Sequence, residues 1–367
     1  MRPDVIVVGL GSMGAAAAAE LARRGVRVLG LDRFTPPHGR GEHAGGSRII
    51  RLAYAEGEAY VPLLRRAYEL WGDLGDDLLT TTGGLNLGRP DSATVSGALA
   101  SARKHGLAHE LLDAAEVRRR FPVFTPADDE VALYEEVAGV VRPERAIDTW
   151  LHEARAAGAD LRFDAPVTGW RAAPDGDVTV DVGGEEITAA RLVLAPGPWA
   201  GELLGDAVTP LRVESRLQHY WMASPEADPR AVWIWEPPGD EVAYGIPAFD
   251  GVVKAAFHHV GPPTDGDRGA PESTPADLAA LTGWLATRMP ALTRARYEGA
   301  KPCLYTITPD EDFVLGPHPA SSNVSVAAGF SGHGFKFAPV IGEILADLAE
   351  SGSTAHPIAP FAPDRAR

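Results

Sequence analysis

The sequence predicts an α/β protein in which one domain is assembled from separated segments and a β-rich (α+β) domain is inserted between them. A strand, glycine-rich turn, helix and second strand occupy residues 4–32, residues 208–305 alternate strands with turns, and a strand, glycine-rich turn and helix follow at 323–350. A chain of 367 residues is long enough for two or three domains. We expect the assembled domain to comprise residues 1–80, 138–207 and 306–367, and the inserted domain to comprise 81–137 and 208–305.

The N-terminal unit is the most informative local segment. Residues 4–8 form a β-branched run that suits a strand buried on both faces. Residues 15–24 have helical propensity, Gly25 suits the end of that helix, and residues 26–31 predict a second strand. This order of elements is typical of a βαβ unit.

The turn of this unit has the spacing Gly9-x-Gly11-x-x-Gly14. The first two glycines permit a tight turn and let a pyrophosphate approach the N–H groups at the helix start, and the third lets helix and strand pack closely. Asp32 follows 18 residues after Gly14, where a carboxylate accepts hydrogen bonds from an adenosine ribose. We therefore predict a dinucleotide site, with a plain βαβ turn as the alternative. The glycines do not distinguish FAD from NAD(P), and Asp32 argues only against a 2′-phosphate.

The later segments supply the rest of the two domains. We predict a helix at 144–157, short strands at 160–170 and 178–182, a buried strand leading into a glycine turn at 190–199, a loop at 261–275, a strand at 323–328, and a helix at about 339–350.

The composition argues against several classes of partner. A net charge of −16 disfavours nucleic acids and anionic membranes, since both require a basic surface. The uncharged stretch at 5–19 is shorter than a membrane-spanning helix and is interrupted by glycines. Cys303 is the only cysteine, which excludes an intrachain disulfide and an all-cysteine zinc site. We expect a cytoplasmic protein with no metal, nucleic-acid or membrane partner.

Five stretches of the chain resemble one enzyme family. They are residues 5–32, Gly46-Ser-Arg-Ile-Ile-Arg51, Lys301-Pro-Cys-Leu-Tyr305, Pro309-Asp-Glu-Asp-Phe313 and Gly329-Phe-Ser-Gly-His-Gly-Phe-Lys336. In this order they resemble the monomeric sarcosine oxidase and N-methyltryptophan oxidase family, flavin amine oxidases related to D-amino-acid oxidase, from residue 4 to about residue 350. The resemblance implies that the assembled domain is a Rossmann-like FAD-binding domain and that the inserted domain binds the substrate.

The same resemblance implies that FAD is attached covalently through Cys303. A lone buried cysteine is otherwise a small, inert apolar residue. The thiolate is the nucleophile in such an attachment, so a nearby cation such as an arginine would assist it. The residues expected to bind the cofactor are Gly9, Gly11, Ser12, Met13, Gly14, Asp32, Arg33, Ser47, Arg48, Val167, Cys303, Gly329, Gly332, Gly334, Phe335 and Lys336.

Arg48 and Arg51 are three residues apart and share a face at helical or turn spacing. A solvated basic face is the alternative, but the two isoleucines between them indicate burial, and a buried arginine needs an anion. The resemblance implies that Arg51 and Lys336 bind the substrate carboxylate and that Arg48 lies near the flavin.

Lys254 lies in a predicted strand whose alternation places it on one face with Ala256 and His258. A solvent-facing lysine is the alternative. The resemblance implies that Lys254 holds a water against flavin N5 and activates O2, where its charge stabilises developing superoxide. It also implies that His258 and Tyr305 line the substrate pocket.

Tyr244 matches a pocket tyrosine of the family, and its position depends on the following turn. A two-residue turn at Asp250-Gly251 would pair Tyr244 with Phe257, on the wrong face. A three-residue loop that includes Phe249 would pair it with Ala256, on the same face as Lys254.

These expectations define an FAD-dependent amine oxidase. A small secondary amino acid, N-methyl or cyclic, would be oxidised to an imine by a monomeric enzyme while O2 is reduced to H2O2. The alternatives are a biosynthetic cyclic imino acid or another amine as substrate, an acceptor other than O2, a flavin-binding protein without amine chemistry, and an NAD-dependent dehydrogenase. Three unpaired cations, Arg51, Lys254 and Lys336, argue against an inert binding module, because burying them without an anionic ligand would be costly.

Overall fold

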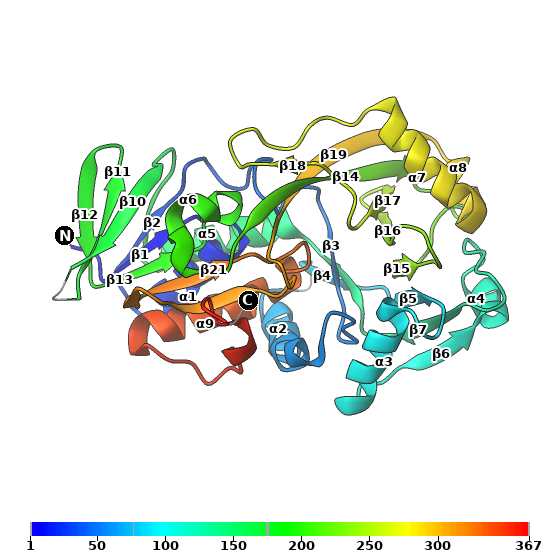
Figure 1. Ribbon diagram of the computed structural model, residues 1–367, viewed down its shortest axis with the longest axis horizontal. Helices are drawn as coiled ribbons and strands as arrows, with labels where there is room; N and C mark the ends of the chain where they lie inside the picture. Colours follow the sequence, from blue (N-terminus) through cyan, green and yellow to red (C-terminus); the bar gives the residue numbers. More distant parts are fainter. Residues whose placement is uncertain (1, 76, 174–175, 366–367) are drawn as a thin grey trace.

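The structure is a computed structural model that describes residues 2–75, 77–173 and 176–365. Residues 1, 76, 174–175 and 366–367 lie outside the described part of the chain. All of them fall in the segments predicted for the assembled domain. A mixed sheet with helices lies toward one end of the elongated molecule, and a larger sheet lies toward the other end (Figure 1).

The first sheet has six strands in the order β20-β21-β13-β1-β2-β9. All neighbouring pairs are parallel except β20 and β21, which are antiparallel. The predicted strands at 4–8, 26–31 and 323–328 are confirmed as its members. The bounds are β1 (Val5–Val8), β2 (Val28–Leu31), β9 (Asp160–Arg162), β13 (Arg191–Leu194), β20 (Val314–His318) and β21 (Ser321–Ala328).

Three helices, α1 (Ser12–Arg23), α5 (Pro143–Ala156) and α9 (Ala338–Ser351), pack together against this sheet, and α1 contacts both of the others. A Cβ atom on Gly14 would lie 1.7 Å from the carbonyl oxygen of Gly9, which confirms that this glycine permits close packing of helix and strand. Helix α1 begins three residues before the predicted start, because its first turn includes part of the glycine motif.

The opposite face of the six-stranded sheet is covered by a three-stranded antiparallel sheet and the short helix α6 (Ala200–Leu204). The small sheet contains β10 (Val167–Ala172), β11 (Val178–Val182) and β12 (Glu185–Ala189), and its apolar side chains join those of β1 and β13 in one core. The predicted strand at 178–182 is confirmed without a change of bounds.

The larger sheet has nine strands, in the order β18-β14-β17-β16-β15-β5-β7-β6, with β19 paired to β14. It collects strands from two separate parts of the chain. The bounds are β5 (Gly84–Gly88), β6 (Glu110–Asp113), β7 (Val131–Glu135), β14 (Arg212–Met222), β15 (Val232–Glu236), β16 (Ala243–Phe249), β17 (Val252–Phe257), β18 (Pro263–Thr264) and β19 (Tyr297–Ile307).

Helices flank this sheet at α3 (Ala93–Lys104), α4 (Ala114–Arg120), α7 (Pro275–Arg288) and α8 (Pro290–Thr293). The prediction of strands and turns throughout residues 208–305 is wrong for α7 and α8. Thr274 caps α7 in a capping box with Asp277, and Pro275 occupies its first turn, where a proline is tolerated. Leu281, Trp284 and Leu285 of α7 pack into the core under the sheet.

A third small sheet joins β3 (Arg48–Ile50), β8 (Gly139–Val141) and β4 (Leu79–Thr81). The helical or turn spacing predicted for Arg48 and Arg51 is therefore wrong, because Arg48 begins a strand that pairs with β8. Arg51 follows that strand. None of the helices in the described part of the chain is both long and apolar enough to cross a membrane.

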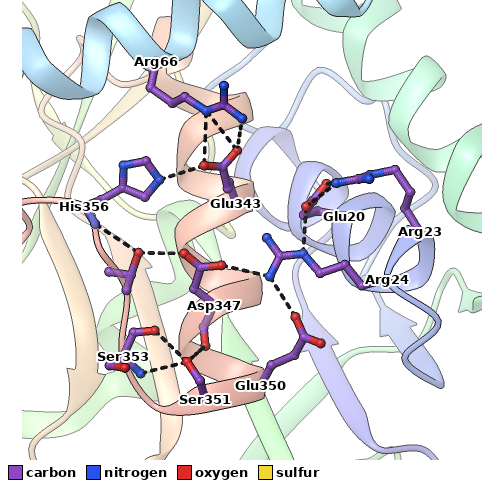
Figure 2. Close-up of polar contacts among 11 residues, drawn as sticks. Glu20, Arg23, Arg24, Arg66, Glu343, Asp347, Glu350, Ser351, Ser353 and His356 are labelled. Carbon is purple, nitrogen blue, oxygen red and sulfur yellow. Dashed lines mark hydrogen bonds and ion pairs between the residues drawn. The ribbon is translucent and has the colours of Figure 1, made fainter.

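An ion-pair network joins three helices that lie near the six-stranded sheet (Figure 2). Arg24, the C-cap of α1, reaches Glu20 on that helix and Asp347 and Glu350 on α9, each at 2.8 Å. Glu343 of α9 accepts from Arg66 of α2 (Val61–Asp73) at 2.8 Å. The network therefore ties α1 and α2 to the C-terminal helix.

Replacing Arg24 by glutamine should lower the free energy of unfolding by about 1 kcal/mol, since it removes three ion pairs that share one partly buried guanidinium. The same change at Arg23, whose side chain is 71% exposed and pairs with Glu20, is the matched control and should have little effect. Urea unfolding at low and high salt measures both variants. Equal midpoints for the two variants would show that the contacts to α9 contribute nothing.

Candidate functional site

Two cavities adjoin each other: the large one is lined by residues of the nine-stranded sheet and by the 332–336 turn, and the small one lies at the ends of β1 and β2 in the six-stranded sheet. The large cavity has a volume of about 330 Å³ and the small cavity about 100 Å³. Ser12, Met13, Glu42 and Phe330 line both of them. A single elongated ligand could therefore occupy both.

The small cavity lies at the start of α1. Gly11 is the N-cap of this helix and supplies no side chain to the N–H groups of the first turn, which leaves them available to an anion. A Cβ atom on Gly9 would lie 2.3 Å from the carbonyl oxygen of Ala195, so only glycine permits this close approach. Asp32, at the end of β2, accepts hydrogen bonds from the N–H groups of Leu10 at 2.6 Å and Phe34 at 2.8 Å. This arrangement fits a dinucleotide.

The large cavity contains three cationic side chains, those of Arg48, Arg51 and Lys336. Arg51 is 5% exposed, so the alternative of a solvated basic face is wrong for it. Its guanidinium stacks over the ring of Tyr54 and donates to Glu56 at 2.6 Å, while its Nε is buried and has no hydrogen-bond partner among the residues that the structure describes. The expectation that Arg51 lacks an anionic partner within the chain is therefore wrong, because Glu56 supplies one five residues later.

Lys336 lies beside Arg51 in this cavity. Its ammonium donates to the carbonyl oxygen of His333 at 2.7 Å and to the hydroxyl of Tyr54 at 3.2 Å. Burial, together with the charge of Arg51, lowers the pKa of Lys336 to about 7. For Glu56, burial opposes ionisation, but the charges of Arg51, His333 and Lys336 hold the pKa of its carboxyl well below the usual range. This part of the cavity favours an additional anion.

The thiol of Cys303 lies beside the guanidinium of Arg48, and a neighbouring cation of this kind would favour the thiolate. Its Sγ is 3.4 Å from Nη2 of Arg48 and 3.4 Å from the carbonyl oxygen of Glu42. Burial raises the pKa of the Cys303 thiol, while the charge of Arg48 favours the thiolate. The thiol is buried and unpaired.

Glu42 is a site residue that the sequence analysis missed. Its Oε1 accepts from the N–H of Thr306 at 2.8 Å, and burial raises the pKa of its carboxyl to about 7. No motif identifies it, because Glu42 and Thr306 are brought together only by the pairing of distant segments. It is the carboxyl group at the junction of the two cavities.

Tyr244 pairs with Ala256, as one of the two predicted alternatives requires. The cause differs from the predicted loop: Phe249 pairs with Val252 across a two-residue turn, and an irregularity between Ile246 and Phe249 shifts the register. The rings of Tyr244 and Tyr305 both approach His258, at 6.0 and 5.8 Å between centroids. These three side chains form an aromatic wall of the large cavity.

Lys254 lies on β17, the strand that His258 follows, but it does not line either cavity. It is 2% exposed, which excludes the solvent-facing alternative. Its ammonium donates to the carbonyl oxygen of Ser47 and to Oε1 of Gln218, both at 2.8 Å. Because Ser47 lines the large cavity, Lys254 lies directly behind that lining residue.

The structure brings most of the predicted site residues together. Those that line the large cavity are Ser12, Met13, Ser47, Arg48, Arg51, Tyr244, His258, Cys303, Tyr305, Gly332, Gly334, Phe335 and Lys336. Those that line the small cavity are Gly9, Gly11, Ser12, Met13, Asp32, Arg33 and Val167. Besides Lys254, Gly14 and Gly329 line neither cavity. Gly14 packs α1 on β1, and a Cβ atom on Gly329 would meet Thr308 and Leu211.

The chain is similar to a known protein family and to known enzymes over nearly its whole length. The DAO family, described as FAD dependent oxidoreductase, matches residues 4–348. Monomeric sarcosine oxidase of Streptomyces avermitilis is 46% identical, with 99% of this chain and 97% of the relative covered. N-methyl-L-tryptophan oxidase of Escherichia coli O157:H7 is 35% identical, with both chains covered completely.

Solved structures give the same result for the fold. The structure of NikD, described as an unusual amino acid oxidase essential for nikkomycin biosynthesis, has a TM-score of 0.86 and 28% identity, with 99% of this chain and 97% of that chain covered. The predicted fold class is therefore confirmed.

Proposed function

The chain belongs to the DAO family of FAD-dependent oxidoreductases, and we propose that it oxidises the C–N bond of a small secondary amino acid, N-methyl or cyclic, to an imine while O2 is reduced to H2O2. Membership makes it an FAD-dependent amine oxidoreductase acting on CH–NH donors, and the alternative of an NAD-dependent dehydrogenase is excluded. The observation that carries the choice of substrate is the cationic pair of Arg51 and Lys336 in the cavity that adjoins the dinucleotide cavity.

The residues present fit an FAD. The first turn of α1 would hold the pyrophosphate and Asp32 the ribose, while Cys303 and the 332–336 turn lie at the large cavity. When bound, the flavin accepts two electrons and a hydrogen from the amine-bearing carbon and passes the electrons to O2.

The protein supplies orientation and charge for this reaction. Arg51 offers a bidentate fork to the substrate carboxylate, and Lys336 offers a point charge beside it. The carboxylate must compete with Glu56, which occupies Arg51 at 2.6 Å. The nearby cations also disfavour an ammonium, so they help the substrate amine to lose its proton before reaction. No residue then has to act as a strong base, and water hydrolyses the imine product.

Tyr244, Tyr305 and His258 are proposed to enclose the substrate. Burial, with a contribution from His259, lowers the pKa of His258 well below its usual value, so its imidazole is neutral and adds no charge to the aromatic wall. A neutral, apolar wall suits the N-methyl group or ring of a secondary amino acid. We assign Lys254 to the reaction with O2, since it is a buried cation directly behind Ser47.

Covalent attachment of the FAD through Cys303 is part of the proposal. Arg48 lies 3.4 Å from the thiol and would stabilise the thiolate that forms the thioether. Cys303 is the only cysteine in the chain, so no other thiol can take its place.

Replacing Cys303 by alanine should release all of the flavin into the supernatant when the protein is precipitated with acid, whereas the wild-type pellet should stay yellow. The variant should still bind FAD before precipitation, because the small cavity is unchanged. The measurement is the flavin absorbance of pellet and supernatant. A colourless wild-type pellet would rule out covalent attachment and leave the oxidase proposal intact.

The oxidase proposal itself is tested by peroxide formation with secondary and cyclic amino acids as substrates. Wild-type protein should produce H2O2 with at least one of them and none with the corresponding amine that lacks the carboxylate. The second candidate substrate is a biosynthetic cyclic imino acid, and its biosynthetic role is supported by the likeness to NikD, an amino acid oxidase essential for nikkomycin biosynthesis. Turnover with an artificial acceptor but not with O2 would point to a dehydrogenase.

We also propose a monomeric enzyme of the cytoplasm. The word monomeric in the name of the relative from Streptomyces avermitilis supports the oligomeric state. With a single cysteine the chain can form no intrachain disulfide, which suits a reducing compartment.

A further inference from the structure

The environment of Lys254 is unusual for a buried ammonium. Its two hydrogen-bond acceptors are both neutral oxygens, the carbonyl of Ser47 and the amide of Gln218. Within the described residues it forms no ion pair with a carboxylate. A buried charge without a counter-ion is costly, so the groups that hold it must be well placed.

Gln218 is held as firmly as the lysine. It lies on β14 and is 1% exposed. Its Nε2 donates to the carbonyl oxygen of Ala44 at 3.2 Å, and its Oε1 also accepts from the hydroxyl of Tyr220 at 3.4 Å. The carbonyl of Ala44 can only accept, so it fixes the amide with its oxygen toward Lys254. The reverse orientation would place an NH2 group against the ammonium.

The backbone around Gln218 is shaped to allow this contact. Gly45 has a φ of +116°, and a Cβ atom there would lie 2.4 Å from Oε1 of Gln218. Gln218 thus bridges the 44–47 segment, which leads to Arg48, and the strand that carries Lys254. Gln218 thereby connects Ser47 and Arg48, which line the large cavity, to Lys254 behind them.

The titratable and charged groups around Lys254, the Tyr220 phenol included, come from four elements. Burial, and then the charge of Arg48 on β3, lower its pKa well below the usual value, and Lys301 on β19 acts in the same direction. Cys303 on β19 and Glu144 on α5 oppose them. The ring of Tyr220 on β14 lies 5.5 Å from the ammonium. Without a close anion, the neutral amide is the nearest side chain that favours the charged form.

We propose that Gln218 is a positioning residue for the oxygen reaction: with the carbonyl of Ser47 it fixes the Lys254 ammonium directly behind the cavity lining, where its charge stabilises the developing superoxide. An ammonium has three donors, and two of them are taken by fixed acceptors. This inference rests on the assignment of Lys254 to O2 in the proposed function. It concerns a residue outside every motif that carried the family resemblance.

The test uses flavin-loaded Gln218→Leu and Gln218→Glu enzymes, with anaerobic reduction and aerobic reoxidation measured by stopped flow across pH. Reoxidation requires the charged lysine, so its rate falls as pH rises through the pKa of Lys254. Removing the acceptor in Gln218→Leu should move the midpoint of that profile down by about one pH unit and slow reoxidation about tenfold above it. Gln218→Glu adds an anion and should move the midpoint upward. Reduction by substrate should change little in either variant.

The outcomes separate this inference from the proposed function. Reoxidation profiles that match wild type in both variants would overturn the role of Gln218. Equal losses in reduction and reoxidation would also overturn it, because they indicate a merely structural residue. If Gln218→Leu does not fold, the nearly isosteric Gln218→Glu still decides the direction of the shift. If Lys254→Met leaves reoxidation unchanged, the assignment of Lys254 is wrong instead.

Discussion

Replacing Lys254 by methionine should slow the reoxidation of the reduced flavin by O2 by about 10²- to 10³-fold, while anaerobic reduction by substrate is largely retained. Methionine preserves much of the length and apolar bulk of the lysine but removes the ammonium. Because Lys254 is 2% exposed, its charge acts in a medium that screens it poorly, and the loss of electrostatic stabilisation should be large. The contacts to Ser47 and Gln218 are lost with it.

Stopped-flow absorbance measures both half-reactions on one sample. Lys301→Met is the matched control, since Lys301 is an exposed lysine on β19, which lies on the far side of β14 from Lys254, and its ammonium is 5.7 Å from the ring of Tyr220. The control should reoxidise at close to the wild-type rate. If Lys254→Met does so as well, the oxygen site lies elsewhere and the buried lysine has only a structural role.

The parts of the fold that local patterns determine could be predicted from the sequence. The β1–α1–β2 unit, its glycine turn and Asp32 depend on contacts between residues close together in the chain, and all of them are found. The spacing of Gly14 alone predicts close helix–strand packing, and its close approach to Gly9 confirms this. Short-range patterns carry this information because the turn chemistry allows few alternatives.

The sequence contains the features that mark the start of helix α7, although its composition predicts a loop there. The composition of residues 261–275 predicts a loop that ends at Pro275, although a proline is equally suited to the first turn of a helix. Thr274 and Asp277 have the spacing of a capping box, and Leu281 and Leu285 recur at helical spacing. The composition of the preceding loop obscured a helix start that the capping residues indicate.

The site contains contacts that no local pattern could predict. Glu56 reaches Arg51 because the chain turns after β3, and Gln218 reaches Lys254 because β14 and β17 pair. The register of Tyr244 depends on an irregularity in β16 that has no unique sequence signature. The family resemblance supplied Arg51, Lys254 and Cys303, but the partners of these residues came only from the three-dimensional arrangement.

Replacing Arg51 by alanine should weaken the binding of substrates and carboxylate inhibitors by about 30-fold to several thousand-fold, the equivalent of about 2–5 kcal/mol. The change removes a charge-assisted contact in a desolvated site and also leaves Glu56, which Arg51 holds at 2.6 Å, as an unpaired anion in the same cavity. That carboxylate would then repel the ligand, which places the expected effect toward the upper part of the range.

The decisive comparison uses a carboxylic acid inhibitor and its primary amide, titrated into the flavin-loaded enzyme and followed by flavin absorbance. Arg51→Ala should lose most of the preference for the acid, while the amide binds about as well as it does to wild type, because the aromatic wall is unchanged. Glu56→Gln is the complementary variant: it removes the anion that competes for Arg51, so it should bind the acid more tightly. In the double variant Arg51→Ala with Glu56→Gln, part of the lost affinity should return, since the repulsion is gone but Lys336 remains. Undiminished acid affinity in Arg51→Ala would move the carboxylate site away from Arg51, and a Glu56→Gln variant that binds the acid more weakly would show that Glu56 supports the arginine rather than competing with the substrate.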